Sequence, residues 1–312
     1  MYDIIIIGLG PAGMTAGIFA ARREMKTLVI GKELGGQLVW ASEIENYPGT
    51  PKVLSFDLIE NMRKQVIDSG AEIKQDEVKQ IERKDDGSFV IYTAHDSFEA
   101  QSLVLAMGLS PRRLAIPGEV ELGGKGVSYC ANCDGPFFKA KVVAVVGGGN
   151  SALDAAEVLS KIAKQVYLIH RNDSFKGFES LQEEIKGREN IEIMMESEIK
   201  LISGENKVES AIVLNKKDES EKEIKLDGIF IEVGRIASTD LVANFVERND
   251  KNQIIIDNQG LTKTPGLFAA GDVTSCEIKQ ITVATGQATI AALSAYKYLQ
   301  EKTGKKFVEK KY

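Results

Sequence analysis

The sequence is poor in cysteine, histidine and tryptophan: its 312 residues contain three, two and one of them, respectively. So few cysteines exclude a secreted scaffold that is held together by several disulfides. No apolar run approaches the length of a membrane span, and residues 1–7 lack the basic start of a signal peptide. We therefore expect a cytoplasmic protein with no membrane attachment.

An excess of positive charge is also lacking. Lys and Arg number 39 against 45 Asp and Glu, which gives a formal net charge of −6, and no basic run is dense enough to track phosphates. We therefore expect no nucleic acid partner. The length and the hydrophobic fraction of 43% suffice for two domains with a core each.

Two of the three cysteines stand in the motif C-A-N-C-D at residues 130–134. A disulfide across so small a loop constrains little of the unfolded chain, whereas a CxxC spacing favours a reactive thiolate. The carboxylate that follows is placed to give or take a proton. A zinc site is the alternative, but the chain offers only Cys276, His95 and His170 as further ligands. The motif therefore predicts a redox-active disulfide and no metal.

A dinucleotide-binding pattern opens the chain. Residues 4–7 predict a strand buried on both faces, and Gly8, Gly10 and Gly13 follow as G-x-G-x-x-G. An alanine-rich helix and a strand at residues 27–30 complete a βαβ unit. In that context the glycines allow a tight turn, the approach of a pyrophosphate and close packing of the helix.

The same pattern returns in the second half of the chain. A strand at residues 141–146 leads into G-x-G-x-x-A at Gly147, Gly149 and Ala152, and a helix and a strand ending at residue 169 follow. The spacing from the first glycine to the end of the second strand is equal in both halves. This internal duplication predicts two bound dinucleotides.

Residues after the second glycine loop indicate which nucleotide that loop binds. Where an acid would hold a free ribose 2′-hydroxyl, the chain has His170, and Arg171 and Lys176 lie on the same loop. Two cations without a carboxylate at that position favour the 2′-phosphate of NADPH over NADH. Asp173 lies between them and weakens this preference.

Between and after these motifs we expect α/β elements. Residues 53–69 and 284–299 predict helices, and a helix after residue 240 and a hairpin at residues 253–261 are also expected. The prediction is an α/β fold of two three-layer, Rossmann-like domains. The first domain spans residues 1–115 and 243–312, and the second, residues 116–242, is inserted in it and carries the CxxC.

Six motifs resemble those of the low-molecular-weight thioredoxin reductases, which are class II pyridine nucleotide-disulfide oxidoreductases, and the resemblance covers nearly the full chain. They are the two glycine loops at 8–13 and 147–152, GGQL at 35–38, ENYPG at 45–49, CANCDG at 130–135 and GDV at 271–273. The resemblance implies FAD in the first domain, a nicotinamide in the inserted one, and a homodimer.

The resemblance also implies roles for single residues. Cys133 is the cysteine nearer the flavin, Cys130 attacks the protein substrate, and Asp134 is the acid–base residue. The FAD contacts that we expect are Gly8, Gly10, Pro11, Ala12, Gly13, Glu33, Gly35, Gly36, Gln37, Leu38, Asn46, Val78, Ala106, Gly108, Gly271, Asp272, Lys279, Gln280 and Ile281. The NADP contacts that we expect are Gly147, Gly149, Asn150, Ser151, Ala152, His170, Arg171, Lys176, Gly234 and Arg235.

The prediction is therefore a thioredoxin-disulfide reductase. Hydride passes from NADPH to FAD, then to the disulfide, and thiol–disulfide exchange reduces thioredoxin or a thioredoxin-like protein. The family's 2′-phosphate motif, His-Arg-Arg-x-x-x-Arg, reads H-R-N-D-S-F-K at residues 170–176, and relatives without the arginines can use ferredoxin. NADH or ferredoxin as donor, a dithiol oxidase, and a nucleotide-binding redox sensor stay open as alternatives.

Overall fold

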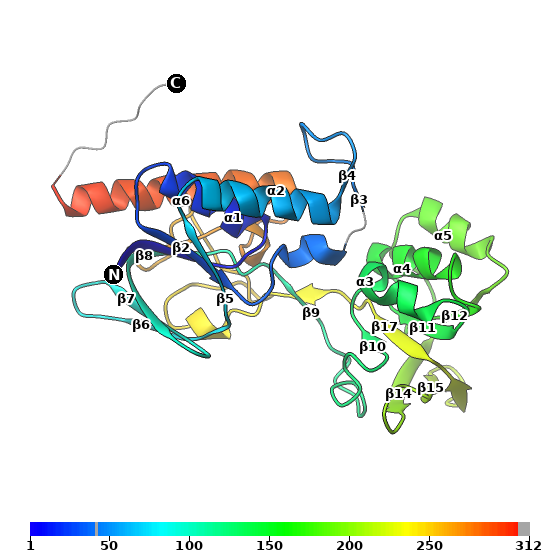
Figure 1. Cartoon of the computed structure of the whole chain (residues 1–312). Coiled ribbons are helices and arrows are strands. Elements are labelled where there is room, and N and C mark those ends of the chain that lie inside the picture. The colour runs from blue at the N-terminus through cyan, green and yellow to red at the C-terminus, as the bar shows by residue number, and fades with distance from the viewer. Residues whose placement is uncertain (41–42, 305–312) are drawn as a thin grey trace. The chain divides into compact units, whose positions relative to one another are not determined.

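The chain forms two compact units in the computed structural model, which describes residues 1–40 and 43–304. One unit contains Met1–Ser110 and the chain from Ile236 onward, and the other contains Pro111–Arg235 (Figure 1). The second unit is thus an insertion in the first. Two short strands lie where the chain passes between them: β9 (Ser110–Pro111) and β18 (Arg235–Ile236).

The first unit is built on a seven-stranded sheet in the order β5-β2-β1-β8-β7-β6, with β19 also paired to β8. The pairs among β5, β2, β1, β8 and β19 are parallel, whereas β6, β7 and β8 pair antiparallel. The strands are β1 (Tyr2–Ile7), β2 (Thr27–Gly31), β5 (Glu72–Gln75), β6 (Val78–Arg83), β7 (Phe89–Thr93), β8 (Ser97–Leu105) and β19 (Leu267–Ala269).

The isoleucine run of β1 is apolar throughout because both faces of this sheet are covered. Ile4 and Ile6 pack in the core beneath the helices, while Ile5 and Ile7 belong to the core of the opposite face. In Figure 1 the helices run along one side of the sheet. They are α1 (Pro11–Ala21), α2 (Ser55–Asp68) and α6 (Ile281–Lys302).

Small side chains let α1 and α6 approach closely. Ala16 and Ala20 of α1 are fully buried, as are Ala288 and Ala291 of α6. This packing holds the N-terminal ends of both helices near the glycine loop. The unit also contains η1 (Gly36–Trp40), β3 (Glu43–Ile44), β4 (Val53–Leu54), η3 (Asp240–Val242) and η4 (Gly271–Val273).

The second unit repeats this plan around a parallel sheet in the order β10-β17-β11-β12-β13. Helices cover one face, and an antiparallel sheet of three strands packs on the other. The parallel strands are β10 (Val127–Ser128), β11 (Val142–Val146), β12 (Gln165–Ile169), β13 (Ile191–Met194) and β17 (Gly228–Ile231). The other elements are α3 (Ala131–Asp134), η2 (Gly135–Phe138), α4 (Asn150–Ser160), α5 (Glu179–Lys186), β14 (Ser197–Ser203), β15 (Ser210–Asn215) and β16 (Glu221–Lys225).

The predicted α/β architecture with two dinucleotide-type sheets is confirmed. The predicted hairpin at residues 253–261 and the full helix after residue 240 are wrong. The described chain has the 3-10 turn η3 there, and Ile254 makes only isolated bridges, to Arg248 and Thr274. No helix within the described ranges combines the length and the apolar character needed to cross a membrane.

Candidate active site

The first glycine loop joins β1 to α1, and its geometry admits no side chain at two positions. Gly8 has a φ of +126°, and a Cβ there would lie 2.1 Å from the Ala106 carbonyl oxygen. A Cβ on Gly13 would lie 1.8 Å from the carbonyl oxygen of Gly8. Both glycines are therefore required for β1, α1 and the end of β8 to meet.

Two further glycine segments close around the start of α1. The Gly35 amide donates to the Leu9 carbonyl at 2.8 Å, and a Cβ on Gly36 would lie 3.1 Å from Gly10 Cα. Gly271 brings η4 against Ala12, where its own Cβ would come within 2.9 Å of the alanine Cβ. Segments from three parts of the sequence thus meet at one helix N-terminus.

The space at that N-terminus fits a pyrophosphate. A Cβ on Gly10, the residue before α1, would meet no protein atom closer than 3.7 Å. Unlike Gly8 and Gly13, Gly10 is therefore not demanded by packing inside the chain. Free backbone N–H groups and the helix dipole favour an anion at this point. The first unit therefore fits a dinucleotide such as FAD.

Polar side chains far apart in sequence pair beside this loop. Gln37 Nε2 donates to Asp272 Oδ2 at 2.6 Å, and Asn46 Nδ2 donates to Gln280 Oε1 at 3.2 Å. Lys279 Nζ donates to the Asp272 carbonyl at 3.0 Å, and burial lowers the pKa of this lysine. These predicted FAD contacts form one cluster of hydrogen-bonding groups.

One member of this cluster was missed by sequence reasoning. Gln287, in the second turn of α6, accepts a 2.9 Å hydrogen bond from the Gly271 amide and a 3.2 Å bond from Thr274 Oγ1. A glutamine inside a helix carries no motif, so no sequence signal would have identified it. Its carbonyl oxygen fixes the turn that presents Asp272.

The remaining predicted FAD contacts occupy different environments. Gly108 has a φ of +64° and lies next to the Gln37 amide group, and Leu38 is buried. Ile281 is the first residue of α6. Glu33 is exposed in the turn after β2.

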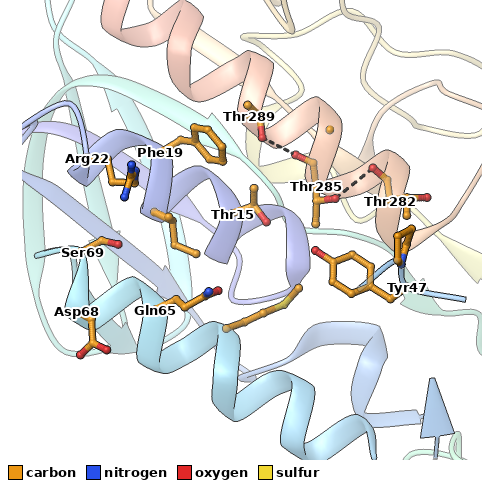
Figure 2. A pocket seen from close by; sticks show the side chains of 14 residues that line it. Thr15, Phe19, Arg22, Tyr47, Gln65, Asp68, Ser69, Thr282, Thr285 and Thr289 are labelled. Atoms are coloured by element: carbon orange, nitrogen blue, oxygen red, sulfur yellow. Dashed lines mark hydrogen bonds between the residues drawn. The ribbon is translucent and has the colours of Figure 1, made fainter. Parts of the chain in front are cut away.

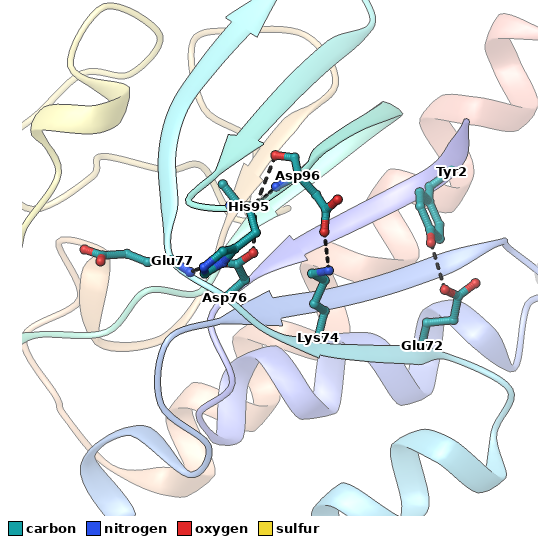
Figure 3. A network of polar contacts seen from close by, with 8 residues as sticks. Tyr2, Glu72, Lys74, Asp76, Glu77, His95 and Asp96 are labelled. Carbon is teal, nitrogen blue, oxygen red and sulfur yellow. Dashed lines mark hydrogen bonds and ion pairs between the residues drawn. The ribbon is translucent and has the colours of Figure 1, made fainter.

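Val78 starts β6, two residues after the buried Asp76. Figure 3 shows Asp76 with its polar neighbours. Asp76 accepts hydrogen bonds from the Glu77 amide and Thr93 Oγ1, each at 2.8 Å, and lies 3.1 Å from His95 Nδ1. Burial would raise the pKa of Asp76, but these hydrogen bonds outweigh it and hold the pKa below its ordinary value. Asp76 therefore ties the end of β5 to the β6–β7 hairpin.

A separate cavity of about 780 Å³ lies among α1, α2 and α6 of the same unit. Figure 2 shows Thr15 and Phe19 of α1, Gln65 of α2 and Thr285 of α6 around it. None of its lining residues is among the FAD contacts predicted from the sequence. The cavity therefore belongs to the side of the sheet that the helices cover, and not to the predicted set of FAD contacts.

The glycine loop of the second unit has the same geometry as the first. Gly147 has a φ of +148°, and a Cβ there would lie 2.2 Å from the Glu232 carbonyl oxygen and 2.7 Å from Ala152 Cβ. A Cβ on Gly149, the residue before α4, would meet nothing within 4 Å. The helix N-terminus is again open to a phosphate, so the second unit also fits a dinucleotide.

The loop at residues 170–178 packs onto this glycine loop. The Lys176 amide donates to the Gly148 carbonyl at 2.7 Å, and the Phe178 amide donates to Asn150 Oδ1 at 2.8 Å. His170 is buried, with Nε2 3.0 Å from the Ser174 carbonyl oxygen, and burial lowers its pKa. The imidazole is therefore a neutral packing element.

The other predicted NADP contacts lie around this loop. Arg171 and Lys176 are exposed, so both cations are available to an anion. Ser151 is exposed in the first turn of α4. Gly234, with a φ of +96°, and Arg235 follow β17, whose end lies beside the end of β11.

The CxxC motif contains a disulfide between Cys130 and Cys133, with the two Cα atoms 5.4 Å apart. Cys130 is only 6% exposed, whereas Cys133 is exposed. The Cys133 amide lies 3.0 Å from Cys130 Sγ, and the Asp134 amide donates to the Cys130 carbonyl at 3.1 Å. In residues 1–40 and 43–304, no cluster of three or more His, Cys, Asp or Glu side chains could hold a metal.

Sequence reasoning also missed Ser128, which precedes the motif by two residues. Its hydroxyl oxygen lies 2.6 Å from Asp134 Oδ2 and accepts the Cys130 amide hydrogen at 3.0 Å. The acid that follows the CxxC is therefore held by a buried side chain.

Several known proteins are similar to this chain in sequence and in structure. The pattern of the pyridine nucleotide-disulphide oxidoreductase family matches residues 2–288. A thioredoxin reductase of Treponema pallidum is 38% identical over 300 residues, which cover 96% of this chain and 97% of that protein.

Solved structures of thioredoxin reductases are also similar to this chain. The thioredoxin reductase of Lactococcus lactis superposes with a TM-score of 0.87 at 38% identity, over 96% of this chain and all of that one. A ferredoxin-flavin thioredoxin reductase of Clostridium acetobutylicum gives a TM-score of 0.53 at 30% identity, over 96% and 98% of the two chains. The chain therefore belongs to the pyridine nucleotide-disulphide oxidoreductase family and, within it, to the thioredoxin reductases.

Proposed function

We propose that this protein is a thioredoxin-disulfide reductase that uses FAD and NADPH. The observation that carries the proposal is the disulfide of Cys130 and Cys133, followed by Asp134, whose carboxylate accepts a hydrogen bond from Ser128, in a unit that has its own glycine loop. Its full-length similarity to thioredoxin reductases supports the same activity. The expected partner is thioredoxin or a thioredoxin-like protein.

The two units have separate tasks in this proposal. The first holds FAD through the Gly8–Gly13 loop and the Asp272 cluster, and the second holds the nicotinamide through Gly147 and Gly149. When bound, FAD passes electrons from the nicotinamide to the disulfide. Asp134 gives or takes the proton that accompanies the opening of the disulfide. The domain boundaries after residues 115 and 242 remain our prediction.

The cysteines also have separate tasks. The Cys130 thiolate attacks the thioredoxin disulfide and forms a mixed disulfide, which Cys133 then resolves. Cys130 is buried in the disulfide state, so the motif must expose its sulfur before the attack. A rotation between the two units is a means of doing so.

Single cysteine variants test these roles. Cys130→Ser is expected to keep reduction of the flavin by the donor and to abolish thioredoxin reduction. Cys133→Ser keeps the attacking thiol and is expected to trap thioredoxin as a mixed disulfide. Cys276→Ser, which removes the free cysteine, is the control and is expected to retain full activity. Thioredoxin turnover by Cys130→Ser would reverse the assignment.

The donor is inferred from the loop at residues 170–178. Its hydrogen bonds to Gly148 and Asn150 keep it over the glycine loop, and Arg171 and Lys176 are exposed there. Two cations near a ribose favour the 2′-phosphate of NADPH. Anaerobic mixing with NADPH and with NADH, followed by flavin absorbance, tests this. Fast bleaching by NADPH alone is expected.

A ferredoxin-dependent reductase is the second candidate. Its support is the structural similarity to the Clostridium acetobutylicum ferredoxin-flavin thioredoxin reductase, together with the loss of two arginines from the motif at residues 170–176. Bleaching by reduced ferredoxin, with none by either nicotinamide, would make this candidate the correct one.

We also propose a cytoplasmic homodimer, in which a second copy covers the cavity on the helical face. Gly286 lines that cavity, and the 45% exposed Ile290 lies one turn further along α6. Ile290→Asp is expected to shift sedimentation equilibrium toward the monomer. Ile278→Asp, at another exposed isoleucine outside the helix, is the control and leaves a dimer intact.

A further inference from the structure

The Ser128 hydroxyl connects the CxxC motif to the acid that serves it. Ser128 is the last residue of β10 and is 5% exposed. Its Oγ atom lies 2.6 Å from Asp134 Oδ2, 3.0 Å from the Cys130 amide nitrogen and 3.3 Å from the Cys130 carbonyl oxygen. This buried hydroxyl therefore lies within hydrogen-bonding distance of three groups of its own unit.

The direction of these hydrogen bonds follows from counting protons. A serine hydroxyl has one proton to donate, and the Cys130 amide can only donate. The Asp134 carboxylate is the better acceptor, because it is charged and lies 0.7 Å nearer than the Cys130 carbonyl. The Cys130 N–H therefore donates to Ser128, and Ser128 donates to Asp134. Each hydrogen bond in such a chain polarises the next.

Ser128 and Asp134 lie in secondary-structure elements of different kinds. Ser128 belongs to the parallel sheet, where it pairs with Phe230 of β17. Asp134 is the last residue of α3, a helix of only four residues. The hydroxyl thus links the carboxylate of this short helix to the sheet, and without it the carboxylate can change rotamer more easily.

We propose that Ser128 is a positioning residue that aims and stabilises the Asp134 carboxylate for proton transfer at the disulfide. When a dithiothreitol thiolate attacks the exposed Cys133 Sγ, a new S–S bond forms and the Cys130–Cys133 bond breaks. The electron pair of that bond stays on Cys130 Sγ, which takes the proton of the Asp134 carboxyl group. In the reverse direction Asp134 takes that proton back.

Reduction of the disulfide by excess dithiothreitol tests this inference directly. Free thiols are counted by alkylation at intervals between pH 5 and 9. Ser128→Ala is expected to lower the rate about tenfold, a part of what a well-placed general acid contributes. The dependence of the rate on pH is expected to weaken, because proton transfer from Asp134 contributes less to the rate in the variant. Ser128→Thr keeps a hydroxyl and is expected to restore most of the rate.

Two further variants separate positioning from a general loss of structure. Ser210→Ala removes a buried hydroxyl that lies 2.7 Å from the Glu223 carboxylate in the same unit, and it is expected to leave the rate and the pH profile unchanged. Ser128→Ala combined with Asp134→Asn is expected to be no slower than Asp134→Asn alone, since the serine acts through the acid. An unchanged profile in Ser128→Ala, or losses that multiply in the double variant, would overturn the inference.

The inference rests on the proposed function, but the assay does not. If the parent protein fails to reduce thioredoxin while Ser128→Ala still slows the dithiothreitol reaction, the thioredoxin reductase assignment fails and the role of Ser128 stands. If thioredoxin is reduced equally well by the parent protein and by Ser128→Ala, with equal dithiothreitol profiles, only the role of Ser128 fails.

Discussion

Glu232 is expected to give the second unit a stability that depends on pH and that can be measured without any cofactor. It follows β17, where its amide donates to the Val146 carbonyl at 2.8 Å and its own carbonyl abuts Gly147. Burial raises the pKa of its carboxyl group from 4.5 to about 7; nearby Asp154 adds to this rise, and Arg235 opposes it. The carboxyl group is thus mainly neutral in the folded chain below pH 7.

The sign and size of the effect on the free energy of unfolding follow from the difference between these two pKa values. A raised carboxyl pKa stabilises the fold fully below pH 4.5, and this stability is lost as the pH rises to 7. At about 1.4 kcal/mol for each pKa unit, the loss in free energy of unfolding is about 3–4 kcal/mol at most. Glu232→Gln, which stays neutral, is therefore expected to be more stable than the parent protein at pH 8 and close to it at pH 5.

Hydrogen exchange measured by mass spectrometry on peptides from β11 and β17 compares the local stability of Glu232→Gln with that of the parent protein. Parent and variant are compared at the same pH, so intrinsic exchange rates cancel. Glu205→Gln, at an exposed glutamate of the same unit, is the control and is expected to change nothing at either pH. Equal protection of Glu232→Gln and the parent protein at pH 8 would refute the reasoning.

Alanine substitutions at Gly10 and at Gly13 separate the packing of the first glycine loop from its binding of a ligand. Gly10→Ala is expected to leave the unfolding temperature nearly unchanged and to weaken FAD binding at least about tenfold in a flavin titration, because its Cβ enters only the open space before α1. Gly13→Ala is expected to lower both the unfolding temperature and the affinity for FAD, because its Cβ would overlap the Gly8 carbonyl. Equal unfolding temperatures of the Gly10→Ala and Gly13→Ala variants would contradict this. Replacing Arg171 and Lys176 together by Ala is expected to raise the KM for NADPH about tenfold or more and to leave that for NADH unchanged, as steady-state kinetics would reveal.

The sequence is most informative where local backbone demands coincide with function. The glycines of both loops could be assigned because a strand, a tight turn and a helix N-terminus require them in that order. The run at residues 4–7 predicted a strand covered on both faces, and both core clusters of the first unit contain its isoleucines. The duplication followed from the same pattern.

Contacts between distant segments could not be predicted in this way. Gln37 meets Asp272 across 235 positions of the sequence, and only the resemblance to a family indicated that both face one ligand. Ser128 escaped notice because an isolated serine on a short strand carries no motif. The predicted hairpin at residues 253–261 failed because Ile254 and Leu261 make isolated bridges to other segments rather than a ladder with each other.

The two halves of the duplication differ at the end of their second strand, where Gly31 and His170 are counterparts. A Cβ on Gly31 would lie 3.0 Å from the Leu9 amide, so the first unit has no room for a side chain there. In the second unit the imidazole of His170 occupies the space that a Cβ on Gly148 would need, 2.3 Å from it. Gly148→Ala is therefore expected to destabilise the unit, and His170→Ala is expected to relieve most of that loss, with a coupling of about 1–2 kcal/mol in a double-mutant cycle. Additive effects in that cycle would mean that the glycine is needed for its backbone alone.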